Sequence, residues 1–262
     1  MARIFITGST DGLGRAAAQA LIADGHQVVM HARSRERAAA IADLALQESA
    51  VDESAVVIGD LASAADTASI ADQVNRIGRM DAVIHNAGTY NARGRNATPE
   101  GHATTLAVNT LAPYMLTALI ERPDRLIYLS SGMHRDGTGS LRDIDWVERA
   151  WDSSRAYSES KLYVAALAFA VARHWPDVLS NAVDPGWVPT RMGGPGAPDD
   201  LAMGYQTQAW LAVSDDPGAM VSGRYWYHRT PQTPAAQVCE SGFQDQLMAR
   251  LAELTGVSLL RG

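Results

Sequence analysis

The stretch Ile4-Phe-Ile-Thr-Gly-Ser-Thr-Asp-Gly-Leu-Gly14 joins a short apolar run to an alanine-rich segment that reaches Ala23. The apolar run predicts a buried strand, and the alanine-rich segment predicts a helix that ends before Gly25. The three glycines between them allow a tight turn, and the N-terminus of a helix offers free N–H groups to a phosphate. This context predicts a dinucleotide-binding turn with the spacing G-x-x-x-G-x-G. The alternative is a glycine-rich turn without a ligand.

The same alternation of short apolar runs and helical patterns continues along the chain. Strands are predicted at residues 28–30, 56–58, 82–85, 126–129, 178–183 and 224–227, and helices at 35–47, 63–76, 99–119, 155–175, 199–213 and 240–254. Alternating strands and helices imply a parallel sheet with both faces covered. The predicted fold class is therefore α/β, a single doubly wound Rossmann-type domain over residues 1–262. We expect a mostly parallel seven-stranded sheet with helices on both faces.

Two stretches lack a regular period. Residues 132–154 lie between a predicted strand and its helix, and residues 185–198 contain four prolines and four glycines. Irregular stretches of this length inside a compact domain are usually functional. We therefore expect an insert at about 132–154 and a substrate lid at about 187–215.

Composition narrows the function classes. The 262 residues include 29 acidic and 22 basic side chains, and the net charge of −7 disfavours a nucleic-acid partner. The single cysteine, Cys239, cannot form an internal disulfide and favours a cytoplasmic location. The longest apolar stretch, residues 162–172, is too short for a membrane span. The seven histidines show no spacing typical of a metal site.

The end of the second predicted strand bears on the choice of cofactor. A site for NAD(H) usually places an acid there, which holds the ribose 2′-hydroxyl. The chain instead reads His31-Ala-Arg33-Ser34, and Arg33 with Ser34 can pair with a 2′-phosphate. We therefore expect NADP(H), with NAD(H) as the alternative if Arg33 is simply a solvated loop residue.

Seven motifs in order resemble those of the short-chain dehydrogenase/reductase family. They comprise the glycine turn from Thr7, Asp60-Leu61, Asn86-Ala-Gly88, Asn109, Ser130-Ser131, Tyr157-x-x-x-Lys161 and Pro185-Gly186 with Thr190. The interval of 26 residues between Ser131 and Tyr157 is longer than usual. In this respect the chain resembles the retinol-dehydrogenase-like branch and the related carbonyl reductases.

The resemblance implies a catalytic set of Asn109, Ser131, Tyr157 and Lys161. Carbonyl reduction needs a proton for the forming alkoxide, and Tyr157 is the candidate general acid, although an ordinary pKa of ~10 suits neutral pH poorly. Lys161 lies one helical turn further on, where its ammonium would favour the tyrosinate. By the resemblance, Lys161 also bonds the nicotinamide ribose, Asn109 anchors a water that relays protons to Lys161, and Ser131 holds the substrate oxygen.

The resemblance also implies the cofactor contacts. Asn86 and Gly88 are expected near the adenosine ribose, Asp60 near adenine, and Thr190 near the nicotinamide carboxamide. Together with Arg33, Ser34, Tyr157 and Lys161, the expected set comprises Gly8, Ser9, Thr10, Asp11, Gly12, Leu13, Gly14, Asp60, Leu61, Asn86, Ala87, Gly88, Pro185, Gly186, Val188 and Thr190.

The expected function is that of an NADP(H)-dependent oxidoreductase that interconverts a lipophilic or aromatic ketone or aldehyde and its alcohol. A non-catalytic NADP-binding regulator and a methyltransferase are the alternatives. The first would be expected to lose a catalytic residue, and the second leaves Tyr157-x-x-x-Lys161 unexplained. Several large apolar side chains lie after the predicted strand at 178–183 and in the insert, and they either line a substrate pocket or pack in the core. They are Trp146, Trp151, Trp187, Met192, Met203, Tyr205 and Trp210.

The expected partners are a small-molecule carbonyl or alcohol substrate and a second copy of the chain. The predicted helix that begins near Tyr157 is apolar on almost all sides, so both of its sides should be buried. One side packs on the sheet, and the other either meets a partner subunit in a homodimer or homotetramer or is covered by the insert. His134, which follows the serine pair, is expected at the surface.

Overall fold

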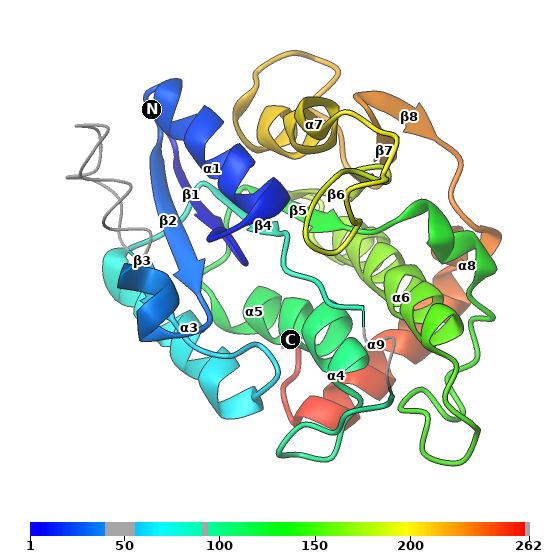
Figure 1. The fold of residues 1–262 in the computed structure, drawn as a ribbon. Helices are drawn as coiled ribbons and strands as arrows, with labels where there is room; N and C mark the ends of the chain where they lie inside the picture. Colours follow the sequence, from blue (N-terminus) through cyan, green and yellow to red (C-terminus); the bar gives the residue numbers. More distant parts are fainter. Residues whose placement is uncertain (40–55, 91–93, 260–262) are drawn as a thin grey trace.

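The structure, a computed structural model, describes residues 1–39, 56–90 and 94–259. Its single sheet has the strand order β3-β2-β1-β4-β5-β6-β7-β8, seen in Figure 1. The strands are β1 (Arg3–Ile6), β2 (Gln27–Ala32), β3 (Val56–Ile58), β4 (Ala82–His85), β5 (Arg125–Leu129), β6 (Leu179–Asp184), β7 (Tyr225–Tyr227) and β8 (Thr230–Gln232). All neighbours pair in parallel except β7 and β8, which are antiparallel. The mostly parallel Rossmann-type sheet is confirmed.

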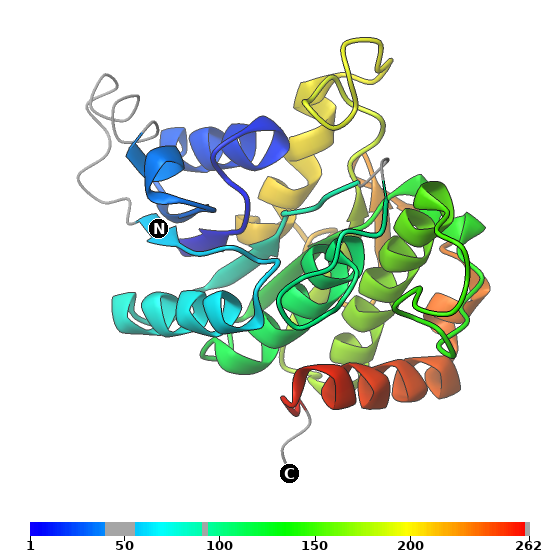
Figure 2. The same cartoon turned by 60° about the horizontal axis from the view of Figure 1, so that its bottom comes forward.

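Helices cover both faces of the sheet, as Figures 1 and 2 show. One face carries α1 (Gly12–Ala23) and α7 (Leu201–Val213), which contact each other and share one apolar cluster with the strands. The other face carries the larger cluster, built on α3 (Ala64–Ile77), α5 (Ala112–Leu119) and α6 (Ser153–His174). The shorter elements and the last helix are α4 (Thr104–Leu106), η1 (Ala107–Leu111), η2 (Gly132–Asp136), α8 (Ala236–Cys239) and α9 (Ser241–Thr255).

Three predictions about the elements need correction or qualification. The sheet has an eighth strand, β8, which sequence periodicity missed because its three residues are exposed and include a proline. The helix predicted from residue 99 begins only at Thr104, since Ala97 and Ala103 first pair as an isolated bridge. The helix predicted at 35–47 is helical at residues 35–39, and its remainder lies outside the described residues.

The apolar helix α6 is covered on its outer side by its own chain. It contacts α8, α9 and η2, and the buried side chains Leu247 and Leu251 of α9 belong to the same core cluster. Ile144 of the insert is also buried in that cluster. The insert therefore helps to cover the outer side of this helix, which was one of the two alternatives. The formation of a homo-oligomer stays a prediction. Among the described residues, no helix is both long enough and apolar enough to cross a membrane.

Candidate active site

The glycine turn forms one wall of a cavity of ≈ 580 Å³ at the carboxyl ends of the strands. Gly8 has a φ of +63°, and a Cβ on it would lie 3.1 Å from the Cα of Ala87, so both conformation and space require glycine. Asp11 caps α1 by accepting a hydrogen bond from the Gly12 N–H at 2.8 Å. The start of α1 therefore opens into the cavity, where a phosphate group can approach its backbone.

His31 holds this turn in place, a function that sequence reasoning missed. Its Nδ1 accepts a hydrogen bond from the Gly8 N–H at 2.9 Å, and its Nε2 lies 2.9 Å from the Gly59 carbonyl oxygen. Burial lowers the pKa of His31, which keeps the ring neutral and Nδ1 free to accept. The sequence feature that could have indicated this role is a histidine at the end of an otherwise apolar strand.

Most of the expected cofactor contacts line this cavity, but not all. The lining includes Gly8, Thr10, Asp11, Gly12, Leu13, Arg33, Asp60, Leu61, Asn86, Ala87, Gly88, Tyr157, Lys161, Pro185 and Thr190. The Ser9 side chain instead turns inward, where it accepts from the His31 N–H and donates to the Ile6 carbonyl. Gly14 packs against Asn86, and Ser34 accepts from the Arg37 N–H. None of these three residues lines the cavity, and the expected contacts Gly186 and Val188 line a second cavity instead.

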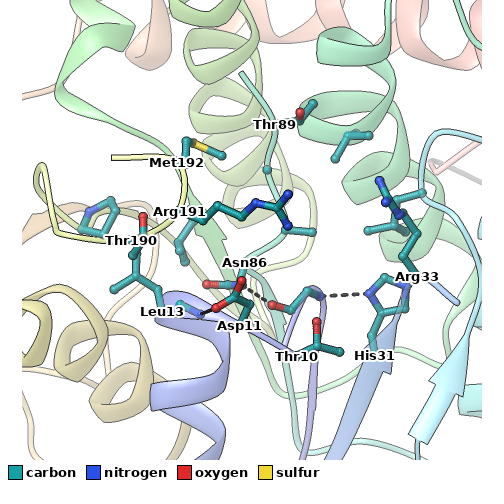
Figure 3. Close-up of a pocket in the computed structure, with 18 of the residues that line it drawn as sticks. Thr10, Asp11, Leu13, His31, Arg33, Asn86, Thr89, Thr190, Arg191 and Met192 are labelled. Atoms are coloured by element: carbon teal, nitrogen blue, oxygen red, sulfur yellow. Dashed lines mark hydrogen bonds between the residues drawn. The ribbon is translucent and has the colours of Figure 1, made fainter. Parts of the chain in front are cut away.

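Arg191 lines the cavity although sequence reasoning did not select it. Figure 3 shows its side chain extending from the loop after Thr190 into the space between Met192 and Arg33. Arg191 is exposed, and no carboxylate lies within ion-pair distance of it in the described part of the chain. Lysine and arginine thus contribute three side chains to the described lining of the cavity, those of Arg33, Lys161 and Arg191.

Tyr157 and Lys161 project from the first turns of α6, which Asp152 caps by accepting from the Arg155 N–H. The Lys161 Nζ donates to the Leu129 carbonyl at 2.8 Å and lies 5.6 Å from the centre of the Tyr157 ring. The hydroxyl of Ser130 donates to the Lys161 carbonyl at 2.9 Å. The end of β5 and the start of α6 are therefore fixed to each other.

Burial dominates the electrostatics of this pair. It raises the pKa of Tyr157 to about 12, although the Ser131 hydroxyl opposes this by hydrogen bonding to the phenol. It lowers the pKa of Lys161 to about 8, although the Asp184 carboxylate opposes this. The sequence led us to expect a phenol with a lowered pKa. The pKa of Tyr157 instead shifts upward, because burial and the Asp184 carboxylate outweigh the effect of the Ser131 hydroxyl.

Asn109 lies in a π-helical turn, η1, between α4 and α5. Pro113 has no N–H to give to the carbonyl four residues earlier, which is that of Asn109, so a regular α-helix is interrupted here. The Asn109 side chain accepts from the Thr89 N–H at 2.8 Å and donates to the Ser160 hydroxyl at 2.9 Å. It therefore connects α6 to the segment that follows β4.

A second cavity, of ≈ 740 Å³, adjoins the first at Tyr157. Its lining includes Tyr90, Ser131, Gly132, Met133, Tyr157, Asp184, Gly186, Trp187, Val188, Met192, Asp199 and Tyr227. Of the large side chains considered for a substrate pocket, Trp187 and Met192 lie here. Met203, Tyr205, Trp210, Trp146 and Trp151 do not. Trp210 packs edge-on against Trp226 in the layer of α1 and α7, and Trp146 packs edge-on against Trp151 within the insert.

His134 is fully buried, so the expected surface position is wrong. Its Nδ1 lies 2.7 Å from the Ser131 carbonyl oxygen, and its Nε2 accepts from the Ala235 N–H at 3.0 Å. Burial lowers the pKa of His134 to about 4, so the ring is neutral at physiological pH. It joins the serine turn to the segment before α8.

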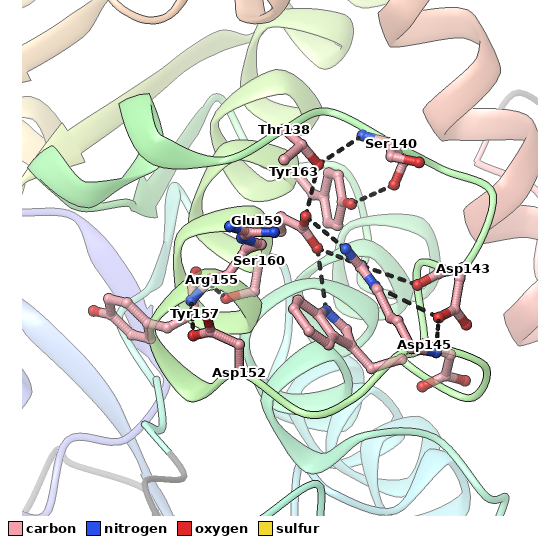
Figure 4. A network of polar contacts seen from close by, with 12 residues as sticks. Thr138, Ser140, Asp143, Asp145, Asp152, Arg155, Tyr157, Glu159, Ser160 and Tyr163 are labelled. Carbon is pink, nitrogen blue, oxygen red and sulfur yellow. Dashed lines mark hydrogen bonds and ion pairs between the residues drawn. The ribbon is translucent and has the colours of Figure 1, made fainter.

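The insert is attached to α6 through one buried carboxylate, that of Glu159, which Figure 4 shows at the centre of a polar network. Glu159 accepts from the Thr138 hydroxyl at 2.7 Å and from the Trp146 indole at 3.1 Å. Arg149 forms an ion pair with it and also stacks over the Trp146 ring. Residues from the early and the late part of the insert therefore contact the same side chain, that of Glu159, which lies two positions after Tyr157.

Comparison with known proteins identifies the family. A family model described as enoyl-(acyl carrier protein) reductase matches residues 8–215. The short-chain dehydrogenase chry4 of Gibberella zeae is 37% identical over 262 residues, which cover 99% of this chain and 99% of the relative. The chain belongs to the short-chain dehydrogenase/reductase family.

Other members of the family extend the comparison. Retinol dehydrogenase 14 of Mus musculus is 30% identical, over 85% of this chain and 76% of its own. The solved structure of a blue fluorescent protein from a metagenomic library, in complex with NADPH, has a TM-score of 0.70 and 22% identity, over 86% of this chain and 95% of that one. The resemblance on which the site residues were chosen is thus confirmed at the level of the family, and this short-chain dehydrogenase/reductase is an oxidoreductase.

Proposed function

We propose that this chain is an NADP(H)-dependent reductase of lipophilic or aromatic ketones and aldehydes, or a dehydrogenase of the matching alcohols. One observation carries the proposal: Tyr157 lines both cavities, so the same phenol faces the glycine turn and the apolar pocket. A nicotinamide bound in the first cavity supplies the hydride. The protein must then deliver a proton and hold the carbonyl oxygen in the second.

The residues of the first cavity fit a nicotinamide dinucleotide. A Cβ on Gly88 would lie 3.3 Å from the Lys161 Nζ, so glycine leaves the space beside the lysine open. We infer that the backbone of the glycine turn and the Arg191 guanidinium hold the pyrophosphate, since both line the cavity and neither carries a negative charge. Arg33, which lines the cavity, is proposed to favour the 2′-phosphate of NADP(H), and Lys161 to bond the ribose.

In the proposed reaction Tyr157 donates its proton to the carbonyl oxygen as an alkoxide forms. Its raised pKa means that it is protonated before reduction, as a general acid must be. The Ser131 hydroxyl, which lines the second cavity beside Tyr157, donates to the same carbonyl oxygen and stabilises the growing charge. We propose that Lys161 and a water at Asn109 restore the proton, and that residues 187–215 act as a lid with Met192 at its inner side.

The experiment that tests this function combines binding and turnover. We expect NADPH fluorescence to change on mixing with the protein, and NADPH absorbance to fall when aromatic ketones or retinal are added. Tyr157→Phe should lower turnover by about 100-fold or more and leave NADPH binding nearly intact. Tyr205→Phe, on α7 outside both cavities, is the control. Full activity of Tyr157→Phe would contradict the proposal.

A further inference from the structure

The two cavities that meet at Tyr157 differ in their charged side chains. The described lining of the first cavity contains the cations of Arg33, Lys161 and Arg191 as well as two carboxylates, those of Asp11 and Asp60. The second cavity contains no lysine, arginine or histidine among its described lining residues, and its only charged side chains are Asp184 and Asp199. Because the other described lining residues are uncharged, the two carboxylates determine the sign of its electrostatic potential.

Asp199 is the more available of the two carboxylates. It is half-buried, and its Oδ2 accepts a hydrogen bond from the Trp187 N–H at 2.6 Å. No basic nitrogen lies within ion-pair distance of Asp199 in the described part of the chain. Among the described residues its negative charge therefore has no ion-pair partner, and a titratable ring close to it is that of His228, whose Nε2 lies beside Gly186 as the Asp199 Oδ2 does.

Asp184 lies deeper and is partly compensated. It is 8% exposed, and it accepts hydrogen bonds from the backbone N–H groups of Gly186 and Gly132. Arg135 and His228 are close enough to influence it, but neither lines the cavity. Asp184 therefore adds to the negative potential while it fixes the loops on either side of Tyr157.

Aromatic rings complete the surroundings of Asp199. Tyr90, Trp187 and Tyr227 line the same cavity, and the Trp187 indole donates to the Gly193 carbonyl at 2.9 Å, which holds its ring in place. Aromatic faces and a carboxylate with no basic partner together attract organic cations. They also repel carboxylates and phosphates, so acyl-carrier and coenzyme A thioesters are poor candidates for this pocket.

We propose that the pocket selects carbonyl substrates that carry a protonated amine, with Asp199 as the counter-ion and Trp187 and Tyr227 as the aromatic wall. This inference rests on the proposed reductase function and adds the charge of the substrate to it. The amine is held several atoms from the carbonyl, because the carbonyl must reach Tyr157 while the cation reaches Asp199.

Three ketones of matched shape test the proposal. They are 4-(dimethylamino)butyrophenone, its uncharged carbon isostere 5-methyl-1-phenylhexan-1-one, and the anionic 4-benzoylbutyrate. We expect kcat/KM with NADPH to favour the amine over the isostere by about fivefold or more, with the acid poorest. The preference should shrink at high salt, because ions screen a half-buried carboxylate.

Two variants locate the effect. Asp199→Asn removes the charge but keeps an oxygen that can accept from the Trp187 N–H, and it should reduce the ratio of amine to isostere to near one. Asp200→Asn removes the same charge one residue away, outside the cavity, and keeps a side chain that can cap α7. It should leave the ratio unchanged. An equal loss in both variants would overturn the assignment to Asp199.

Calorimetric titration of the same ketones into the protein with NADP⁺ separates this inference from the reaction. Turnover of all three ketones at similar kcat/KM would overturn the charge selection and leave the reductase function standing. Binding that keeps the order amine, isostere, acid without any turnover would support the charge selection and contradict the proposed reaction.

Discussion

Arg149 of the insert and Glu159 of α6 form a two-pronged ion pair, with 3.0 Å between Nη1 and Oε1 and 2.6 Å between Nη2 and Oε2. The carboxylate is 1% exposed, and Thr138 and Trp146 donate to it as well. A buried charge with this many donors is satisfied only while the insert stays in place. The helix that presents Tyr157 and the irregular segment before it are thus stabilised as one unit.

Removal of this carboxylate should be costly. We expect Glu159→Ala to lower the free energy of unfolding by about 3 kcal/mol, because Arg149 and the Trp146 indole lose their common acceptor. Urea denaturation followed by circular dichroism measures the change. Glu148→Ala, at an exposed position of the same insert, is the control and should be nearly neutral. A similar loss in both variants would show that the network contributes little.

Lys161 is the only lysine in the sequence, which allows its titration to be followed directly. In protein labelled with ¹⁵N-lysine, the single side-chain signal should titrate near pH 8 without cofactor, because burial lowers the pKa of Lys161 to about 8. An exposed lysine titrates near 10.4. A midpoint above pH 10 in the folded protein would contradict the expected burial.

The same shift predicts how stability depends on pH. Between the folded pKa near 8 and the ordinary pKa of 10.5, the unfolded chain binds more protons, so the free energy of unfolding rises with pH. Below pH 8 the folded protein carries the full cost of the buried charge. Lys161→Met should therefore be more stable than the wild type at pH 7, by on the order of 1–2 kcal/mol, and the gain should shrink toward pH 10. Lys161→Arg keeps the charge and should show no gain.

Arg33 should act on one cofactor only. We expect Arg33→Ala to raise the Kd for NADPH by about tenfold or more and that for NADH by less than about twofold, since only NADPH carries the 2′-phosphate. Separate fluorescence titrations with NADPH and with NADH measure the two constants. Arg35→Ala, two residues further on, is the control. A wild-type protein that prefers NADH would contradict the assignment of NADP(H).

Arg191 should act on both cofactors alike. If its guanidinium holds the pyrophosphate, Arg191→Ala should raise the Kd for NADPH and NADH by the same factor, about three- to tenfold. Arg142→Ala, an exposed position in the insert, should change neither constant. Selective loss of NADPH binding would instead assign Arg191 to the 2′-phosphate.

The strands that build the central sheet could be predicted because they are buried on both faces. Runs such as Ile4-Phe-Ile6 and Ala82-Val-Ile-His85 are almost continuously apolar, and the glycines that follow them mark the loops. The exposed strand β8 has no such pattern. The start of α4 at Thr104 was also missed, because the bridge between Ala97 and Ala103 depends on tertiary contacts and not on local preference.

Side chains whose contacts come from distant segments could not be predicted. His31 meets Gly8 and Gly59 only after three strands are aligned, and His134 is buried only because Ala235 returns to it from 101 residues away. Trp146 and Trp151 were considered for the substrate pocket on composition alone. Trp146 instead bonds Glu159 and Trp151 packs against Trp146, which depends on how the insert folds back over α6.

The burial of Lys161 also has a practical consequence. Its side chain is 4% exposed, so an amine-reactive reagent finds no ε-amino group on the outside of this chain. Acylation of that amine requires the site to open. The rate of this acylation, measured by mass spectrometry at a single position, therefore reports how often the site opens. A bound dinucleotide should lower that rate.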